Sequence, residues 1–175
     1  ILRTFENPES KNLKIIYNEE NYGLPKSLNI GIKASKSEFI VRVDSDDYVN
    51  KNFLNFLKTY ILHNDSIGAL SSDYLLVDEN ENILERVNCD ERPIGCGIIF
   101  RKSLLEEIGL YDEKFLCNEE IDLMFRFKKN YKIERLPIPL YRYRRHKDNI
   151  TNKDDLMDYY YQELAKKHNI ENKTN

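Results

Sequence analysis

The sequence predicts an α/β fold in which a mixed sheet is flanked by helices. Residues 39–43 (FIVRV) give a strand signal, because four of the five are apolar and either β-branched or aromatic. An acidic loop follows, and residues 51–63 then carry apolar side chains at helical spacing. Residues 67–77 and 83–87 are apolar runs separated by a polar turn, which predicts an antiparallel hairpin. The α/β unit and the hairpin together make the sheet mixed.

Length and composition are those of an ordinary globular protein. The chain has 175 residues, of which 41% are hydrophobic and 33% charged, and its net charge is −3. This length predicts one domain with a real core, over residues 1–150, followed by a C-terminal helix and tail over 151–175. The charge balance does not indicate nucleic acid as a partner. The three cysteines lack paired metal-site spacing, which predicts reduced thiols in a cytoplasmic protein.

The remaining elements follow from apolar periodicity and from turn residues. Residues 13–17 (LKIIY) are a short strand candidate, and Pro25 fits the first turn of a helix with Leu28 and Ile32 on one face. Gly31 inside this helix indicates a close approach of backbone or ligand as readily as a suboptimal helix. Further predicted elements are a strand over 98–100, a helix over 104–108, a helix that begins at 119, strands over 132–136 and 141–147, and a helix over 154–169.

Three carboxylates, Asp44, Asp46 and Asp47, follow the strand 39–43 where its apolar pattern ends. Ligands bind at the carboxyl ends of strands in open α/β sheets, and carboxylate oxygens suit Mg²⁺ or Mn²⁺, which bridge phosphate oxygens. The spacing of Asp44 and Asp46 therefore indicates a metal-dependent nucleotide-sugar site. The structural alternative is an Asp-rich turn, because Asp bonds its own backbone. A calcium loop and an aspartyl-phosphate enzyme both fit poorly, because Tyr48 stands where each needs another residue.

Two further clusters have both a structural and a functional interpretation. Gly95 and Gly97 precede the apolar run 98–100 and indicate tightly accommodated backbone. Glu119, Glu120 and Asp122 open the next helix, where acids often serve only the helix dipole.

The segment 141–147 (YRYRRHK) is basic and aromatic. Alternation of Tyr and Arg is typical of a half-buried edge strand. Its arginines, among them Arg144 and Arg145, together with His146, would also suit a diphosphate near an acidic metal site, because guanidinium groups bind phosphate oxygens in a bidentate fork. Both interpretations stay open.

Taken together, these residues resemble the family-2 glycosyltransferases, inverting enzymes of the GT-A fold that use nucleotide sugars. The resemblance covers residues 13–150 and implies a GT-A-like, Rossmann-type mixed sheet flanked by helices. The matching segments are NYGLPKSLNIGIKAS for the Asn-x-Gly loop and helix, FIVRVDSDDYV for the aspartate motif, PIGCGIIFRKSLLEEIGLYDEKF for the acceptor-side loop, strand and helix, NEEIDLMFRF for the Glu-Asp-x-Asp-Leu helix, and YRYRRHKDNIT for the Tyr-Arg-x-His segment.

One part of the family pattern has no counterpart in the chain. The family begins with strands that end in Pro-Thr-Tyr-Asn and in Asp-Asp-x-Ser and hold the nucleotide, and neither motif is present. We therefore expect the first βαβ portion of the nucleotide-binding half, roughly fifty residues of an ordinary domain, to be absent.

The resemblance also implies a role for each matched residue. Asp46 would ligate Mn²⁺ or Mg²⁺, Asp44 would bind the ribose or a metal-bound water, and His146 would complete the metal shell or lie near the diphosphate. The family's base is usually the Asp of Glu-Asp, a position that Glu120 occupies here, so Asp122 and Glu119 stay candidates as well. The residues that would contact the nucleotide sugar are Asn21, Gly23, Asn29, Asp44, Asp46, Arg144 and Arg145, and those on the acceptor side are Gly95 and Gly97.

The expected activity is transfer of a sugar, with inversion, from a nucleotide-sugar donor to a glycan or lipid-linked acceptor. A UDP-sugar is the first choice of donor, and the implied process is cell-surface polysaccharide synthesis in the cytoplasm. The basic strip 141–147 would allow peripheral contact with anionic lipid at the inner face of a membrane. Two other hypotheses stay open: a non-catalytic domain that binds a glycan or a partner protein, and a nucleotidyltransferase, which would release pyrophosphate.

Overall fold

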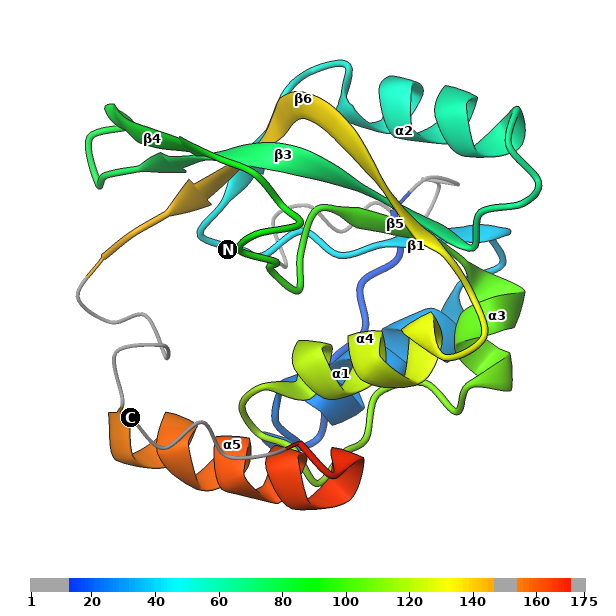
Figure 1. Cartoon of the computed structure of the whole chain (residues 1–175), viewed down its shortest axis with the longest axis vertical. Helices are drawn as coiled ribbons and strands as arrows, with labels where there is room; N and C mark the ends of the chain where they lie inside the picture. Colours follow the sequence, from blue (N-terminus) through cyan, green and yellow to red (C-terminus); the bar gives the residue numbers. More distant parts are fainter. Residues whose placement is uncertain (1–12, 147–153, 171–175) are drawn as a thin grey trace.

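The computed structural model describes residues 13–146 and 154–170 and centres on a six-stranded sheet (Figure 1). The strand order is β1-β5-β3-β6-β2, and β4 pairs with β3 outside this path. β3 and β6 run parallel, whereas the other described pairs are antiparallel, which confirms the predicted mixed sheet. The strands are β1 (Phe39–Val41), β2 (Tyr48–Val49), β3 (Ala69–Val77), β4 (Ile83–Val87), β5 (Ile98–Arg101) and β6 (Ile133–Arg144).

Helices cover both faces of the sheet, as the sequence predicts (Figure 1). α2 lies on one face, while α1, α3 and α4 lie on the other, with α5 beyond α4. Each face has its own apolar core, with Leu57 of α2 at one centre and Phe127 of α4 at the other, both fully buried. The bounds are α1 (Leu24–Ala34), α2 (Phe53–Leu62), α3 (Lys102–Glu107), α4 (Glu119–Lys128) and α5 (Asp154–His168).

The strand β6 corrects the prediction of two separate strands, over 132–136 and 141–147. It is continuous from Ile133 to Arg144 and includes Pro137 and Pro139. Proline cannot donate a hydrogen bond to a ladder. The β3–β6 ladder shifts its register on either side of Asp73, next to these prolines, so pairing resumes beyond them. The segment that follows is an interior strand between β3 and β2, not an edge strand.

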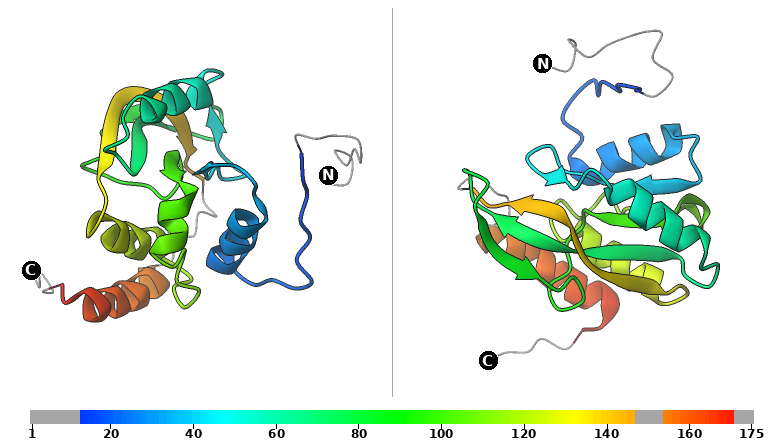
Figure 2. Two further views of the ribbon diagram at one scale, coloured as in Figure 1. Left: turned by 90° about the vertical axis from the view of Figure 1, so that its right-hand side faces the viewer. Right: turned by 90° about the horizontal axis from the view of Figure 1, so that it is seen from above.

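The predicted strand at residues 13–17 does not form. These residues run as an extended segment that leads to α1 and lies beside the body of the molecule (Figure 2). Leu13, Ile16 and Tyr17 are largely exposed. A strand needs the backbone groups of a neighbour, and within 13–146 and 154–170 no strand lies beside this segment.

Two smaller observations bear on the predicted class of protein. The three cysteines are all described and buried, and none of them forms a disulfide. In the part of the chain that the structure describes, no helix combines the length and the apolar character that crossing a membrane requires.

Candidate active site

A cleft of about 600 Å³ lies where the acidic loop, residues 44–47, meets the loop before β5 and the start of α4. The segment before α1 and the first residues of α5 complete its walls. The cleft brings together side chains from distant parts of the chain. The predicted site residues that line it are Asn21, Gly23, Asp44, Asp46, Gly95, Glu119, Glu120 and His146.

The acidic loop is held in place by β6. The hydroxyl of Tyr141, a fully buried residue, donates to Asp47 Oδ2 at 2.7 Å, and the backbone N–H of Arg144 donates to Asp47 Oδ1 at 2.8 Å. The backbone N–H of Asp44 donates to the same Tyr141 hydroxyl at 3.1 Å. Burial raises the pKa of Asp47 above its ordinary value despite these donors. Asp47 therefore fixes the loop and lines the cleft together with Asp44 and Asp46.

Two groups of side chains could hold a metal ion at this loop. One oxygen each of Asp44 and Asp47 and the sulfur of Cys96 all lie within 4.8 Å of one another. Asp46 Oδ2 instead lies 2.8 Å from Nε2 of His146. Burial raises the pKa of the Cys96 thiol, so the carboxylates are the hard oxygen ligands of the first group. The predicted pair of Asp46 and His146 is thus adjacent, and the structure adds Asp44 and Asp47 as an acidic group.

The first turn of α4 supplies two carboxylates to the opposite wall. Glu119 is buried and accepts a hydrogen bond from Nη1 of Arg42 at 3.0 Å. Burial raises the pKa of Glu120 to about 7, and the negative charge of Glu119 acts in the same direction. A carboxyl group with a pKa near neutrality can accept and release a proton under ordinary conditions. Among the candidates for a base, Glu120 has this property and lines the cleft.

Asp122, the other predicted catalytic candidate, is turned away from the cleft. Its carboxylate is fully buried and lies 2.8 Å from Arg126, 2.6 Å from Lys167 and 2.8 Å from Nε2 of His168. Burial acts to raise its pKa, but the hydrogen bonds from Lys167 and His168 and the charge of Arg126 hold that pKa below its ordinary value. Asp122 therefore joins α4 to the end of α5.

Three other predicted site residues have structural contacts. Asn29 is buried and binds both backbone groups of Tyr111, at 2.9 Å and 3.0 Å, which holds α1 to the loop before α4. Gly97 has a φ of 74° and packs on the ring of Tyr141, 3.0 Å from where a Cβ would lie. The guanidinium of Arg144 donates to the backbone oxygens of Asp46 and Glu79 at 2.8 Å and 3.1 Å. Arg144 thus ties the acidic loop to the β3–β4 turn.

Several residues of the cleft were not singled out from the sequence. Arg42 interrupts an apolar strand, a signal that could have drawn attention to it. Cys96 and Tyr141 reach the acidic loop only through the fold. Leu156 and Met157 of α5 line the cleft beside Leu116, and no sequence pattern predicted that this helix would reach it.

Residues 1–86 match the family described as glycosyl transferase family 2. An uncharacterized glycosyltransferase of Haemophilus influenzae is 35% identical over 71 residues, which cover 41% of this chain and 22% of that protein. An uncharacterized glycosyltransferase of Rickettsia typhi is 30% identical over 135 residues, which cover 62% of this chain and 40% of that protein. The chain thus spans less than half the length of these relatives.

Solved structures show the same fold. Residues 1–349 of TarS from S. aureus, in complex with UDP-GlcNAc, have a TM-score of 0.69 and 21% identity, and the match covers 88% of this chain and 49% of that one. The same TarS fragment in complex with UDP has a TM-score of 0.56 and 21% identity over 80% of this chain and 45% of that one. This likeness supports the fold, a mixed sheet flanked by helices.

Proposed function

The chain contains a glycosyl transferase family 2 domain, and from this premise we propose that its cleft transfers a sugar from a nucleotide-sugar donor to an acceptor hydroxyl with inversion. The observation that carries the proposal is the meeting of the acidic loop with the acids of α4 in one cleft. Five carboxylates line the cleft, and the guanidinium group of Arg42 lies among them. An anionic diphosphate would be repelled there without a cation, so donor binding and cation binding are expected together.

The residues of the acidic loop fit a divalent cation. Asp44 and Asp47 offer carboxylate oxygens from one side, and Asp46 offers another beside His146. Such hard oxygen ligands suit Mn²⁺ or Mg²⁺. We assign Asp46 and His146 as its ligands, with Asp44 toward the ribose or a metal-bound water. The bound cation would neutralise charge on the leaving diphosphate, a contribution of several kcal/mol.

Glu120 is the proposed general base. It faces the cleft opposite the acidic loop, and its pKa of about 7 allows it to take the proton of an acceptor hydroxyl near neutral pH. Proton removal of this kind typically contributes about 10² to 10⁴ in rate. Inversion follows if the acceptor approaches from the α4 side while the diphosphate leaves toward the acidic loop.

The substrates are proposed from the walls of the cleft and from the relatives. TarS has been solved with UDP and with UDP-GlcNAc, which makes UDP-sugars the first donors to test. Leu24 and Leu116 are 40% and 46% exposed, and both line the cleft. They would suit a glycan acceptor with an apolar face or a lipid-linked acceptor. Such acceptors belong to cell-surface polysaccharide assembly on the cytoplasmic side of a membrane.

Product analysis tests the proposal. The chain is incubated with Mn²⁺, a panel of UDP-sugars and candidate acceptors, and release of UDP and of pyrophosphate is followed by chromatography. We expect the wild type to release UDP and not pyrophosphate. Most of this release should be lost in the variants Asp46→Ala and Glu120→Gln. Asp65→Asn is the matched control, because the side chain of Asp65 is 98% exposed outside the cleft. Release of pyrophosphate would indicate a nucleotidyltransferase, and no product with any donor would favour a binding domain.

A further inference from the structure

Arg42, the residue that follows β1, lies between the two walls of the cleft. Its Nε and Nη2 donate to the two oxygens of Asp44 at 2.6 Å and 2.9 Å, and its Nη1 donates to Glu119 at 3.0 Å. Its side chain is only 14% exposed. One guanidinium thus joins the acidic loop to the first turn of α4.

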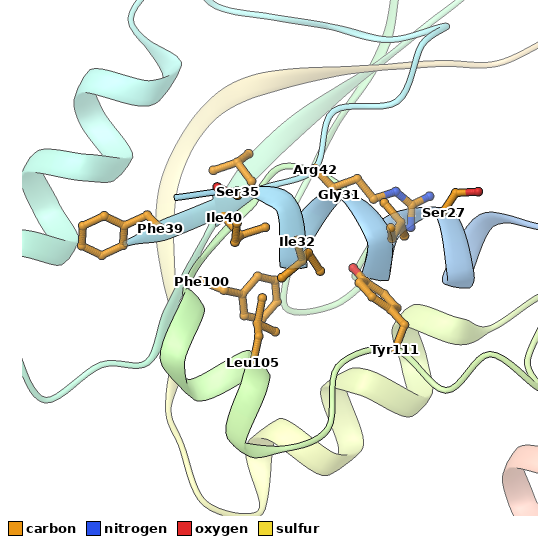
Figure 3. A pocket seen from close by; sticks show the side chains of 12 residues that line it. Ser27, Gly31, Ile32, Ser35, Phe39, Ile40, Arg42, Phe100, Leu105 and Tyr111 are labelled. Atoms are coloured by element: carbon orange, nitrogen blue, oxygen red, sulfur yellow. The ribbon is translucent and has the colours of Figure 1, made fainter. Parts of the chain in front are cut away.

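The surroundings of Arg42 leave it little freedom. A Cβ on Gly95 would lie 2.9 Å from Arg42 Nη1 and 2.7 Å from the Cβ of Glu120. The backbone at Gly95 therefore packs so closely against the guanidinium that there is no room for a side chain. Tyr111 lies on another side, and Figure 3 shows its hydroxyl and Arg42 at the same end of a neighbouring pocket of about 350 Å³. The backbone is held as well, because the N–H of Gly97 donates to the carbonyl of Arg42 at 3.0 Å.

The arrangement requires an arginine rather than any cation. A guanidinium presents its donors in a rigid fork, and here three different nitrogens are used on two carboxylates. A lysine has one nitrogen and cannot grip Asp44 on both oxygens while also reaching Glu119. A buried ion pair adds little net stability, because desolvation offsets the attraction. The contacts of Arg42 therefore serve geometry more than stability.

We infer that Arg42 is a positioning residue that fixes the acidic loop relative to Glu120, so that the leaving group and the proton acceptor stay in register. This inference rests on the proposed function of the cleft. Arg42 need not touch the substrate for this role, because its Nε, Nη1 and Nη2 already donate hydrogen bonds to Asp44 and Glu119. Loss of the bridge would leave Asp44 and Glu119 without their common partner and free to shift, and a misplacement of about 1 Å can cost roughly 10²-fold in rate.

The test compares Arg42→Met, Arg42→Lys and a matched control, Arg135→Met. Arg135 grips Asp73 on both oxygens at 2.8 Å, a pair of the same type outside the cleft. Two quantities are measured: kcat and KM for UDP release from a UDP-sugar, and the titration midpoint of the Glu120 carboxyl by ¹³C NMR. The NMR titration requires no turnover.

We expect Arg42→Met to lower kcat on the order of 10²-fold with a much smaller change in KM. Because the charge of Arg42 lowers the pKa of Glu120, the midpoint should also rise. Arg42→Lys keeps the charge, so the midpoint should return toward that of the wild type while kcat stays low. Arg135→Met should change neither quantity.

Each other outcome overturns a specific part of the reasoning. A kcat and a midpoint for Arg42→Met equal to those of Arg135→Met would refute the positioning role. A raised KM with unchanged kcat would make Arg42 a donor-binding group instead. If the wild type shows no turnover with any donor, the proposed function fails, whereas the midpoints still decide whether Arg42 governs Glu120.

Discussion

Replacing Glu120 by glutamine should make the protein more stable at neutral and alkaline pH. The carboxyl group of Glu120 is partly buried beside Glu119, and its pKa in the folded protein is raised from 4.5 to about 7. Between these two values the folded state holds a proton that the unfolded state has released. The stability of the wild type therefore falls as the pH rises through this window. Glutamine has nearly the same shape as glutamate and carries no charge. The unfolding free energy of the variant should therefore not fall over this pH range.

The magnitude follows from the raised pKa. Each tenfold difference in proton affinity is worth about 1.36 kcal/mol, so a change from 4.5 to about 7 corresponds to roughly 3–4 kcal/mol. Below the ordinary carboxyl pKa both proteins carry a neutral side chain at position 120, and their unfolding free energies should agree. Above about pH 7 the variant should exceed the wild type by up to this amount.

The assay is urea unfolding of both proteins at several values from about pH 5 to about pH 8, with free energies from linear extrapolation. Asp65→Asn removes one negative charge at an exposed position and controls for net charge. The reasoning is refuted if Glu120→Gln and the wild type keep a constant difference across the pH range, because the Glu120 carboxyl would then have an ordinary pKa.

Three further predictions concern the stability of the fold, and urea midpoints at constant m-value check each of them. Gly31→Ala should stabilise the protein by about 0.5–1 kcal/mol, because a Cβ there meets no atom within 4 Å and alanine favours the helix; a loss of stability would contradict this. Gly97→Ala should destabilise it by about 1–2 kcal/mol, because φ is +74° and the Tyr141 ring is adjacent; a neutral result would show that this turn relaxes. Asp73→Ala should cost about 1–3 kcal/mol, because the buried N–H of Cys89 loses its acceptor while the partly exposed Arg135 can turn to water, and a cost near zero would mean that water replaces the carboxylate.

The parts of the site that sequence analysis predicted are encoded locally. The acidic loop stands at the end of an apolar strand, and the acids of α4 stand at the start of a helix, so both could be placed from neighbouring residues. Glu120 then proved to face the cleft, whereas Asp122, two positions further along the helix, is turned to the far side. The helical repeat places Glu120 and Asp122 on different sides of α4. The contacts of Asp122 with α5 show which of the two sides is turned away from the cleft.

The parts that escaped prediction depend on long-range contacts. Arg42 and Glu119 are 77 residues apart in the sequence, and no pattern in either segment predicts that they pair. Pro137 and Pro139 cannot donate hydrogen bonds to a ladder, which predicts that the strand would be interrupted there. A shift in the register of the β3–β6 ladder lets β6 continue past them. Residues 13–17 have the composition of a strand, but strand formation requires a neighbour as well as composition.

The most direct test of the central claim is whether the cleft binds a divalent cation and a nucleoside diphosphate together. Thermal unfolding is measured with Mn²⁺ alone, with UDP alone and with both, for the wild type and for Asp46→Ala. Both ligands together should stabilise the wild type by more than the sum of each alone, by about 2–4 kcal/mol near saturation, and Asp46→Ala should lose this gain. No joint shift in the wild type, or an equal shift in the variant, would contradict it.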